Sequence, residues 1–256
     1  STLESIWASP LPSSISEIEV TGDNQKLAVS QKDKILYTKD TKELICCYSK
    51  DSNINLKDEN NKLEILKIKE YAFRQATNAQ NVVLPDSVTT IETLIFSYHS
   101  GINVQVGKNA KDISHNFNYG NTTGKVTIDS NNNYYTIEDN ILYNKDKTEL
   151  CSVLYWIKGE FKVKDTVKII GDYAFHYQVE MTKITLPVGI TQMNNSFIGC
   201  EGLTEIEIPS TVKQIDGRCF EGCNNLSNIN IKQAENAISG APWGAAKGMK
   251  VINWNR

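Results

Sequence analysis

The feature that most constrains the fold of this chain is a sequence motif that occurs in three consecutive copies between positions 170 and 231. Each copy opens with an apolar residue, and the openings Ile170, Met193 and Ile215 lie 23 and then 22 residues apart. A phenylalanine follows each opening residue within five positions. A fixed period of this length predicts structural units that stack along one axis, each packing against its immediate neighbours.

Each copy also contains two apolar residues separated by one polar residue, a pattern that predicts a short β-strand. The pairs are Ile184/Leu186, Ile206/Ile208 and Ile229/Ile231. A period of two places both apolar side chains on one face of the strand, which is then the buried face. Pro187 and Pro209 follow two of these pairs, and a residue without an N–H suits the end of a strand.

The strand pairs recur along most of the chain. Their first members are Ile18, Ile54, Val82, Val104, Val126, Phe161, Ile184, Ile206, Ile229 and Val251. We therefore expect about ten rungs and a parallel strand ladder, on the order of 45 Å long at ~4.8 Å per rung. Two intervals are longer than the others because each contains an inserted segment.

The inserted segments are two copies of a second motif. Residues 33–44 (DKILYTKDTKEL) return 106 positions later as residues 139–150 (DNILYNKDKTEL). Two apolar stretches separated by a Lys-Asp turn predict a β-hairpin. A hairpin followed by three turns thus occurs twice, which predicts a duplication within one continuous solenoid domain. Its expected parts are an N-terminal cap (1–14), a first unit (15–122), a second unit (123–231) and a C-terminal cap (232–256).

These motifs resemble the BspA-like leucine-rich repeats. The matching segments are Tyr173-Ala174-Phe175, Phe197-Ile198-Gly199-Cys200, Phe220-Glu221-Gly222-Cys223 and the two hairpins. The resemblance implies a mainly β, right-handed leucine-rich-repeat solenoid with short irregular or helical turns. It also implies a microbial surface or secreted protein used in adhesion. Lys34 and Asn140 replace the glycine of the family's hairpin, so a looser bend is expected there.

The end of the chain departs from the repeat. The segment Gly240–Ala246 breaks the phenylalanine pattern, and it resembles the closing segment of BspA-like arrays. Trp243 and Trp254 are expected to cover the last rung, because indole rings offer a large flat apolar area with one polar edge.

Composition narrows the choice of partners and compartment. The net charge is -3 and charges of both signs are interspersed, so no basic patch for nucleic acid or anionic lipid is expected. No apolar run approaches the roughly 18 residues of a membrane helix, so membrane insertion is not expected. A chain that begins at Ser1 fits removal of a signal peptide. We expect a secreted or cell-surface monomer.

No pattern for catalysis stands out. His99, His115 and His176 occupy different positions within the repeat, so its register brings none of them to a particular nucleophile. Phosphate-binding, dinucleotide-binding and zinc-binding motifs are missing. The acidic and amide clusters Asp58–Asn61 and Asp129–Asn133 offer oxygen ligands of the kind calcium binds, but without the spacing of a known calcium loop. We expect no enzyme, no cofactor and no metal.

The cysteines are expected to pack rather than react. Cys200 and Cys223 stand three residues after a phenylalanine, in a slot that we interpret as one for small residues. Other turns place Ala76, His99, Gly120 and Gln178 there. Successive rungs are close enough for a disulfide, so the sequence leaves two alternatives, a bridge or two buried free thiols, and free thiols are favoured. Cys219 takes the place of Ala174 in the preceding turns, which predicts a core position.

The best candidate for a binding surface is the outward face of the strand ladder, formed by the residues that alternate with the buried ones. In the second half these are Glu160, Lys162, Lys183, Thr185, Glu205, Glu207, Asn228 and Asn230. In the first half they are Asn81, Val83, Gln105, Lys125 and Thr127. Solenoids commonly bind partners on such surfaces. The alternative is a polar face that only keeps the protein soluble.

A second candidate contact surface is formed by the aromatic residues on and after the hairpins, Tyr37, Tyr143, Tyr155 and Trp156. Packing of each hairpin on itself is the favoured explanation for these aromatic residues. Together these observations predict a non-catalytic protein-binding or adhesion module, with a host or neighbouring-cell surface or matrix protein as partner. The alternatives are a passive structural spacer and a carbohydrate-binding or enzymatic solenoid. The paired carboxylates or exposed aromatic stripe that the latter needs are not visible on the expected sheet columns.

Overall fold

The computed structural model describes residues 11–12, 14–57, 64–97, 99–113, 117, 124–235, 237–245 and 251–254. These residues form strands and turns, and none of them is helical. The turns expected from the sequence are therefore irregular rather than helical. Most of the expected N-terminal cap, the calcium candidate Asp58–Asn61 and His115 lie outside the described residues.

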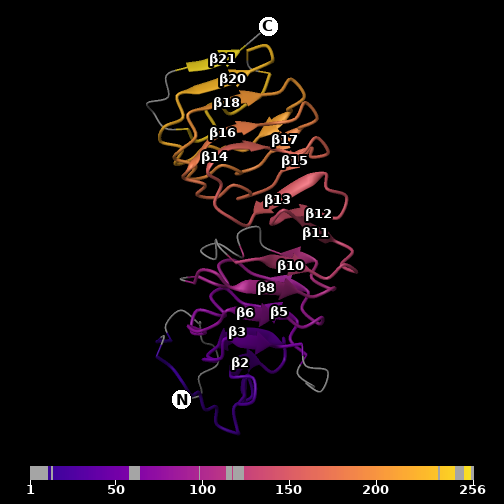
Figure 1. Ribbon diagram of the computed structural model, residues 1–256, viewed down its shortest axis with the longest axis vertical. Helices are drawn as coiled ribbons and strands as arrows, with labels where there is room; N and C mark the ends of the chain where they lie inside the picture. The colour runs from indigo at the N-terminus through magenta and orange to yellow at the C-terminus, as the bar shows by residue number, and fades with distance from the viewer. Residues whose placement is uncertain are drawn as a thin grey trace. The chain divides into compact units, whose positions relative to one another are not determined.

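The chain divides into two compact units, Ser1–Asn140 (unit 1) and Ile141–Arg256 (unit 2). In unit 1, one sheet has the order β1 (Leu27–Ser30), β2 (Ile35–Thr38), β3 (Glu43–Cys47), β5 (Lys67–Ile68), β7 (Thr90–Ile91) and β9 (Asp112–Ile113). The other is a parallel ladder of β10 (Val126–Ile128), β8 (Asn103–Val106), β6 (Asn81–Val83) and β4 (Asn53–Asn55), several of which are labelled in Figure 1. Strand β11 (Tyr135–Glu138) follows. The single continuous domain stays a prediction.

The ladder of unit 1 has the predicted register. Ile54 lies beside Val82, Val82 beside Val104, and Val104 beside Val126. All four side chains are buried. The openings of the turns form a second buried column, in which Ile68 lies beside Ile91. Apolar residues that recur at one period therefore stack directly on one another.

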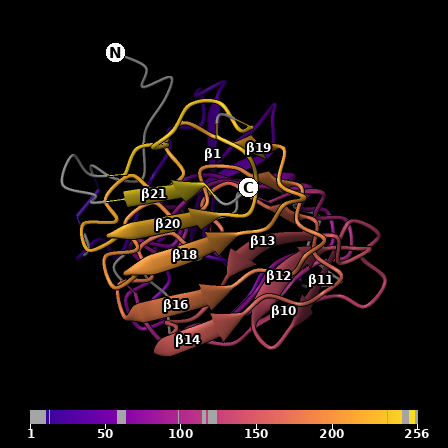
Figure 2. The same ribbon diagram turned by 90° about the horizontal axis from the view of Figure 1, so that it is seen from above.

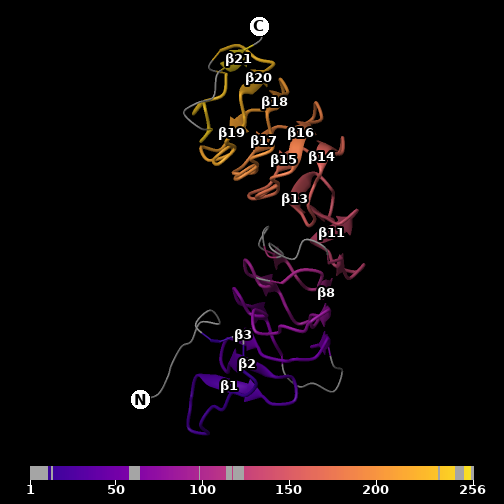
Figure 3. The ribbon, with the colours of Figure 1, turned by 60° about the vertical axis from the view of Figure 1, so that its left-hand side comes forward.

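Unit 2 repeats this organisation. Its first sheet contains β12 (Ile141–Asn144), β13 (Glu149–Val153), β15 (Ile169–Ile170), β17 (Gln192–Met193) and β19 (Gln214–Ile215), several of which are visible in Figure 3. Its strand ladder contains β14 (Gly159–Lys162), β16 (Met181–Thr185), β18 (Glu205–Ile208), β20 (Asn228–Ile231) and β21 (Val251–Trp254), which lie side by side in Figure 2. One hydrophobic core, built from the inward residues of both sets of strands, fills this unit.

Two of the ten expected strand positions are wrong. Ile18 lies outside any strand and packs against a small cluster that includes Leu27 and Tyr48. In the last strand, Ile252 rather than Val251 lies beside Ile229, so the expected position was one residue early. The other eight first members lie in strands, and the described residues form about eight turns rather than ten.

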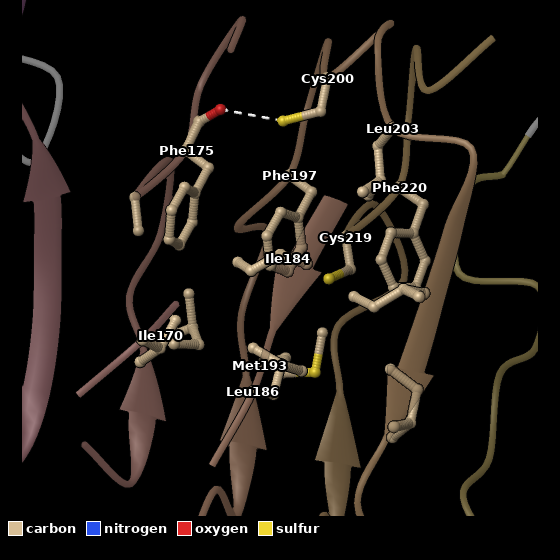
Figure 4. Packing of buried hydrophobic residues seen from close by; sticks show 14 of the residues in the cluster. Ile170, Phe175, Ile184, Leu186, Met193, Phe197, Cys200, Leu203, Cys219 and Phe220 are labelled. Atoms are coloured by element: carbon tan, nitrogen blue, oxygen red, sulfur yellow. Dashed lines mark hydrogen bonds between the residues drawn. The ribbon is translucent and has the colours of Figure 1, made fainter. Parts of the chain in front are cut away.

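The phenylalanines form a buried stack along the axis of each unit. In unit 2 the rings of Phe175, Phe197 and Phe220 are parallel to within 15°, at centroid distances of 5.1 and 5.8 Å (Figure 4). Trp243 lies edge-on to Phe220, with the ring planes at 68° and the centroids 6.4 Å apart, and it is fully buried. The closing segment thus breaks the phenylalanine pattern as predicted, and its indole ring covers Phe220 at the end of the stack. Trp254 packs against Trp243 and is only partly buried, as a covering residue should be.

Both predicted hairpins are present, and they are superimposable in register. Tyr37 lies opposite Leu44 and Tyr143 opposite Leu150, and each hairpin has an irregularity just before this tyrosine. Lys34 and Asn140 have φ angles of 53° and 58°. They adopt the left-handed conformation that glycine would provide, so the bend is kept and is not looser.

Candidate functional site

The outward face of the unit 2 ladder carries all eight predicted site residues. Glu160, Lys162, Lys183, Thr185, Glu205 and Glu207 are exposed, and Asn228 and Asn230 are half-buried. Within each pair of strands the side chains form the expected columns. Glu160 lies beside Lys183 on the next strand, and Glu207 lies beside Asn230. We call this surface the ladder face of unit 2.

Charges on the ladder face pair with one another only in part. Lys183 Nζ lies 3.5 Å from Glu160 Oε1, and Lys232 Nζ lies 2.8 Å from Glu207 Oε1. Because these side chains are about half exposed or more, such pairs contribute little to stability. Glu205 and Lys162 have no ion-pair partner among the residues that the structure describes. The face is thus charged, of mixed sign and incompletely neutralised.

The ladder of unit 2 is interrupted at its centre. Strand β14 pairs with β16 and strand β18 pairs with β20, but β16 and β18 belong to separate hydrogen-bonded sheets. A cleft of ≈ 210 Å³ lies at this interruption. Its lining includes Lys183, Ile184, Thr185, Glu205, Ile206, Glu207 and Asn230. Five of the eight predicted site residues therefore converge on one opening, which we call the β16–β18 opening.

The outward face of unit 1 has a different chemistry. Asn81 Nδ2 donates to Asn53 Oδ1 at 2.7 Å, and Asn103 Nδ2 donates to Asn81 Oδ1 at 2.9 Å. The backbone N–H of Lys125 then donates to Asn103 Oδ1 at 3.1 Å. Asn81 and Lys125 were predicted to face outward, whereas Asn53 and Asn103 were missed, although both stand in the same column of the repeat. The side-chain amides therefore form hydrogen bonds with one another from strand to strand, and such cross-strand pairs stabilise the sheet.

The aromatic residues of the hairpins mostly belong to the core. Tyr143 is 1% exposed, and Tyr155 packs against the core of unit 2. Tyr37 and Trp156 are half-buried. This arrangement agrees with packing of the hairpins on the solenoid rather than with a second contact surface.

Two histidines lie in turns and contact the fold rather than a nucleophile. His99 Nε2 lies 2.9 Å from the carbonyl oxygen of Phe73. His176 lies between the rings of Tyr173 and Tyr177, at centroid distances of 5.2 and 4.5 Å. Burial lowers the pKa of His176 to about 4, so this imidazole is neutral at pH 7.

All six cysteines are free and buried. Burial raises the pKa of the Cys46 and Cys47 thiols to about 12, so neither is a thiolate nucleophile at pH 7. Cys200 and Cys223 form no bridge. The Cys200 Sγ atom instead lies 3.0 Å from the carbonyl oxygen of Phe175 in the preceding turn (Figure 4). The Cys223 Sγ atom lies 3.1 Å from the carbonyl oxygen of Phe197.

The slot that holds Cys200 and Cys223 is therefore more than a place for small residues. His99 occupies the same slot and contacts the equivalent carbonyl of Phe73. Gln178 also occupies it, and its Nε2 donates to Tyr155 O at 2.8 Å. Four side chains in this slot therefore bond to the preceding turn, whereas Ala76 in the same slot has no side-chain donor. The sequence shows which positions can do so, because cysteine, histidine and glutamine can all donate.

The calcium candidate Asp129–Asn133 uses its oxygen atoms within its own loop. Asp129 Oδ1 accepts from the N–H of Asn131 at 2.9 Å, and Asn132 Oδ1 accepts from the N–H groups of Tyr134 and Tyr135. Over the described ranges, no group of three or more histidine, cysteine or acidic residues is arranged to hold a metal ion. Nor does this part of the chain contain a helix able to cross a membrane.

Comparisons with known proteins agree with this architecture. A leucine-rich repeat protein from Eubacterium ventriosum has 20% sequence identity and a TM-score of 0.53, and the match covers 88% of this chain and 80% of that one. The pneumococcal vaccine antigen PcpA has the same identity and TM-score, over 78% of this chain and 62% of that one. Identity this low shows a common fold alone. No curated protein matches the chain.

The family itself is identified by the repeats. The model of the BspA type leucine rich repeat region matches in six copies, over residues 46–154 and 157–243. These ranges make up more than half of the chain and contain the second hairpin motif, residues 139–150, and most of the buried columns of both units. The chain belongs to the BspA-type leucine-rich repeat family.

Proposed function

We propose that this chain is a non-catalytic protein-binding module of a secreted or cell-surface protein, and that its partner contacts the ladder face of unit 2. The partner class is a surface or matrix protein of a host or neighbouring cell. The observation that carries the proposal is the set of exposed side chains of both charges held in register on adjacent parallel strands. Repeat proteins of this kind typically serve protein interaction.

Several further observations support the proposal. A rigid ladder fixes the backbone of every contact residue, so binding orders only side chains and costs less entropy. The faces of the two units differ in part. Unit 1 has a column of amides bonded to one another. Unit 2 has one such amide pair, Asn253 with Asn230, together with ion pairs and the charges of Glu205 and Lys162, which have no ion-pair partner among the described residues. Charged groups of both signs favour recognition of a specific complementary surface. The structural relative PcpA is a vaccine antigen, which fits a surface localisation for this chain as well.

The test is a binding screen of the purified chain against host matrix proteins, cell-surface proteins and glycans, followed by a triple variant. Lys183→Ala, Glu205→Ala and Glu207→Ala together remove three charges from the ladder face. The matched control, Lys213→Ala, Glu201→Ala and Glu235→Ala, removes the same residue types from exposed positions elsewhere in unit 2. We expect the ladder-face variant to lose at least tenfold in affinity, a loss of ~1.4 kcal/mol, and the control to bind like the wild type.

The competing functions give different results in the same screen. A passive spacer would bind nothing in the screen, or would keep all cell attachment in the ladder-face variant. A carbohydrate-binding solenoid would bind glycans and no protein. Either outcome would replace the proposed function.

A further inference from the structure

The β16–β18 opening has a size that suits one side chain. Binding pockets for small molecules usually measure roughly 300–1,000 Å³, whereas this cleft measures ≈ 210 Å³. It is too small for a sugar chain or a folded segment. The interruption lies between consecutive strands of one ladder, so the facing edges of β16 and β18 offer backbone groups that the ladder does not use.

The chemistry of the lining favours a cation. Lys183 forms an ion pair with Glu160 on β14, and Glu207 forms one with Lys232. Glu205 is the lining carboxylate that lacks an ion-pair partner within the described residues. The unused strand edges add backbone carbonyl acceptors as well as N–H donors. A ligand group that enters here therefore meets the negative charge of Glu205 beside backbone hydrogen-bonding groups, and a cation with several N–H donors can use both the charge and the carbonyl oxygens.

The kind of cation that fits is restricted by the donors it can offer. Ile184 and Ile206 also line the cleft, but their side chains are buried in the core of unit 2, so the ligand group is held by polar contacts. Arginine fits better than lysine, because its planar guanidinium has five N–H donors and is less strongly hydrated than an ammonium group. It can pair with a carboxylate and still donate to carbonyl oxygens.

We propose that the β16–β18 opening receives one arginine side chain of the protein partner, with its guanidinium paired to Glu205 and donating to backbone carbonyl oxygens that the interrupted ladder leaves unused. This inference rests on the proposed function, since it names the anchor by which a protein would bind the ladder face. One buried, paired arginine at the centre of a polar surface is a common form of binding hot spot.

The test uses the full chain and a small probe, so it needs no identified partner. The ¹⁵N-labelled protein is titrated with N-acetyl-arginine N-methylamide, and amide shifts are followed by NMR. We expect saturable shifts in the segments 183–186 and 205–208. The citrulline analogue has the same shape without the charge, and it is expected to bind at least tenfold more weakly.

Two variants complete the experiment. Glu205→Gln keeps the shape of the side chain and removes its charge, and is expected to weaken arginine binding about tenfold. Glu201→Gln is the matched control, because Glu201 is an exposed glutamate in the preceding turn that does not line the cleft. It is expected to bind the probe like the wild type. Equal binding of arginine and citrulline, shifts confined to other segments, or full binding by Glu205→Gln would each overturn the inference.

The two proposals fail in different ways. If the triple ladder-face variant loses a protein partner but the arginine probe leaves the opening unchanged, the inference is wrong and the proposed function holds. If that variant binds its partner as strongly as the wild type, the proposed function is wrong whatever the probe shows.

Discussion

Gly199 shows how a single residue limits the turn between two rungs. Its φ angle is +74°, and a Cβ atom added there would lie 2.7 Å from Tyr177 Cδ1. We predict that Gly199→Ala lowers the free energy of unfolding by at least about 1–2 kcal/mol, the cost of a left-handed non-glycine residue, as measured by urea denaturation. Gly217→Ala is the control, since nothing lies within 4 Å of its added Cβ. Equal effects of the two substitutions would contradict this account.

His176 makes the stability of unit 2 depend on pH. Its folded pKa is lowered to about 4 by burial, while the unfolded side chain titrates near its ordinary value of 6.5. Between these values the unfolded chain binds more protons, so stability is full above about pH 6.5 and falls as the pH drops towards 4. With allowance for the part of the ring that still meets solvent, the loss is about 1–2 kcal/mol.

The measurement for His176 is the free energy of unfolding of the wild type and of His176→Gln, each at a series of pH values from 4 to 7. Buried or paired carboxylates affect both proteins alike, so the difference between the two curves isolates the histidine. We expect the difference to change by about 1–2 kcal/mol across this range. Parallel curves would show that burial does not perturb this side chain.

At the scale of elements, the phenylalanine stack predicts which changes stay local. Phe197 is fully buried between Phe175 and Phe220. Phe197→Ala is therefore expected to cost about 3–5 kcal/mol. Amide hydrogen exchange should speed up in the turns that hold these rings and stay unchanged in the ladder of unit 1, because each turn packs only against its neighbours.

Phe161→Ala provides the comparison for the stack. Phe161 packs edge-on against Phe175 at 5.4 Å and is only partly buried. Phe161→Ala should therefore lower the free energy of unfolding clearly less than Phe197→Ala does. If Phe197→Ala increased amide exchange uniformly over both units, the claim that each turn is stabilised only by its neighbours would be wrong. If Phe197→Ala does not fold, Phe197→Leu tests the same point with a smaller cavity.

The elements that the sequence predicted well are those that depend on identical neighbours. Val82, Val104 and Val126 pair as expected because stacked apolar residues at one period leave a single register that buries them all. The repeat pattern did not show that Trp243 is fully buried and lies edge-on to Phe220, because no earlier turn carries an indole ring at this position. Both tyrosine hairpins were predicted from a 12-residue repeat alone.

The candidate site was predictable in its members but not in its central feature. The alternation of polar and apolar residues indicated that Lys183 and Glu205 face outward, and they do. The interruption between β16 and β18 left no trace in the pattern, because Ile184 and Ile206 occupy the same repeat position as residues that pair normally. Two neighbouring strands form ladder hydrogen bonds only when their backbones lie at the right distance and angle. Small shifts of the backbone can break these bonds without any change in the residue pattern.

For the molecule as a whole, the composition of the cores predicts that unit 2 folds by itself. Every buried residue of its core lies between Ile141 and Ala245, and the phenylalanine stack runs on within the unit to Trp243. A fragment of residues 141–256 therefore retains the burial that opposes the loss of chain entropy. We predict cooperative thermal unfolding of this fragment, followed by circular dichroism, with a β-type spectrum below the transition.

A shorter fragment, residues 159–256, tests the reason for this prediction. It lacks the hairpin β12–β13 and with it Tyr143, Leu150 and Val153, which belong to the same core. Without them the first turn would expose its apolar side and an unpaired strand edge, so this fragment should unfold at a much lower temperature or associate. If both fragments melted alike, the hairpin would be an appendage rather than the cap of unit 2. If the longer fragment did not fold, the core of unit 2 would not suffice for its stability.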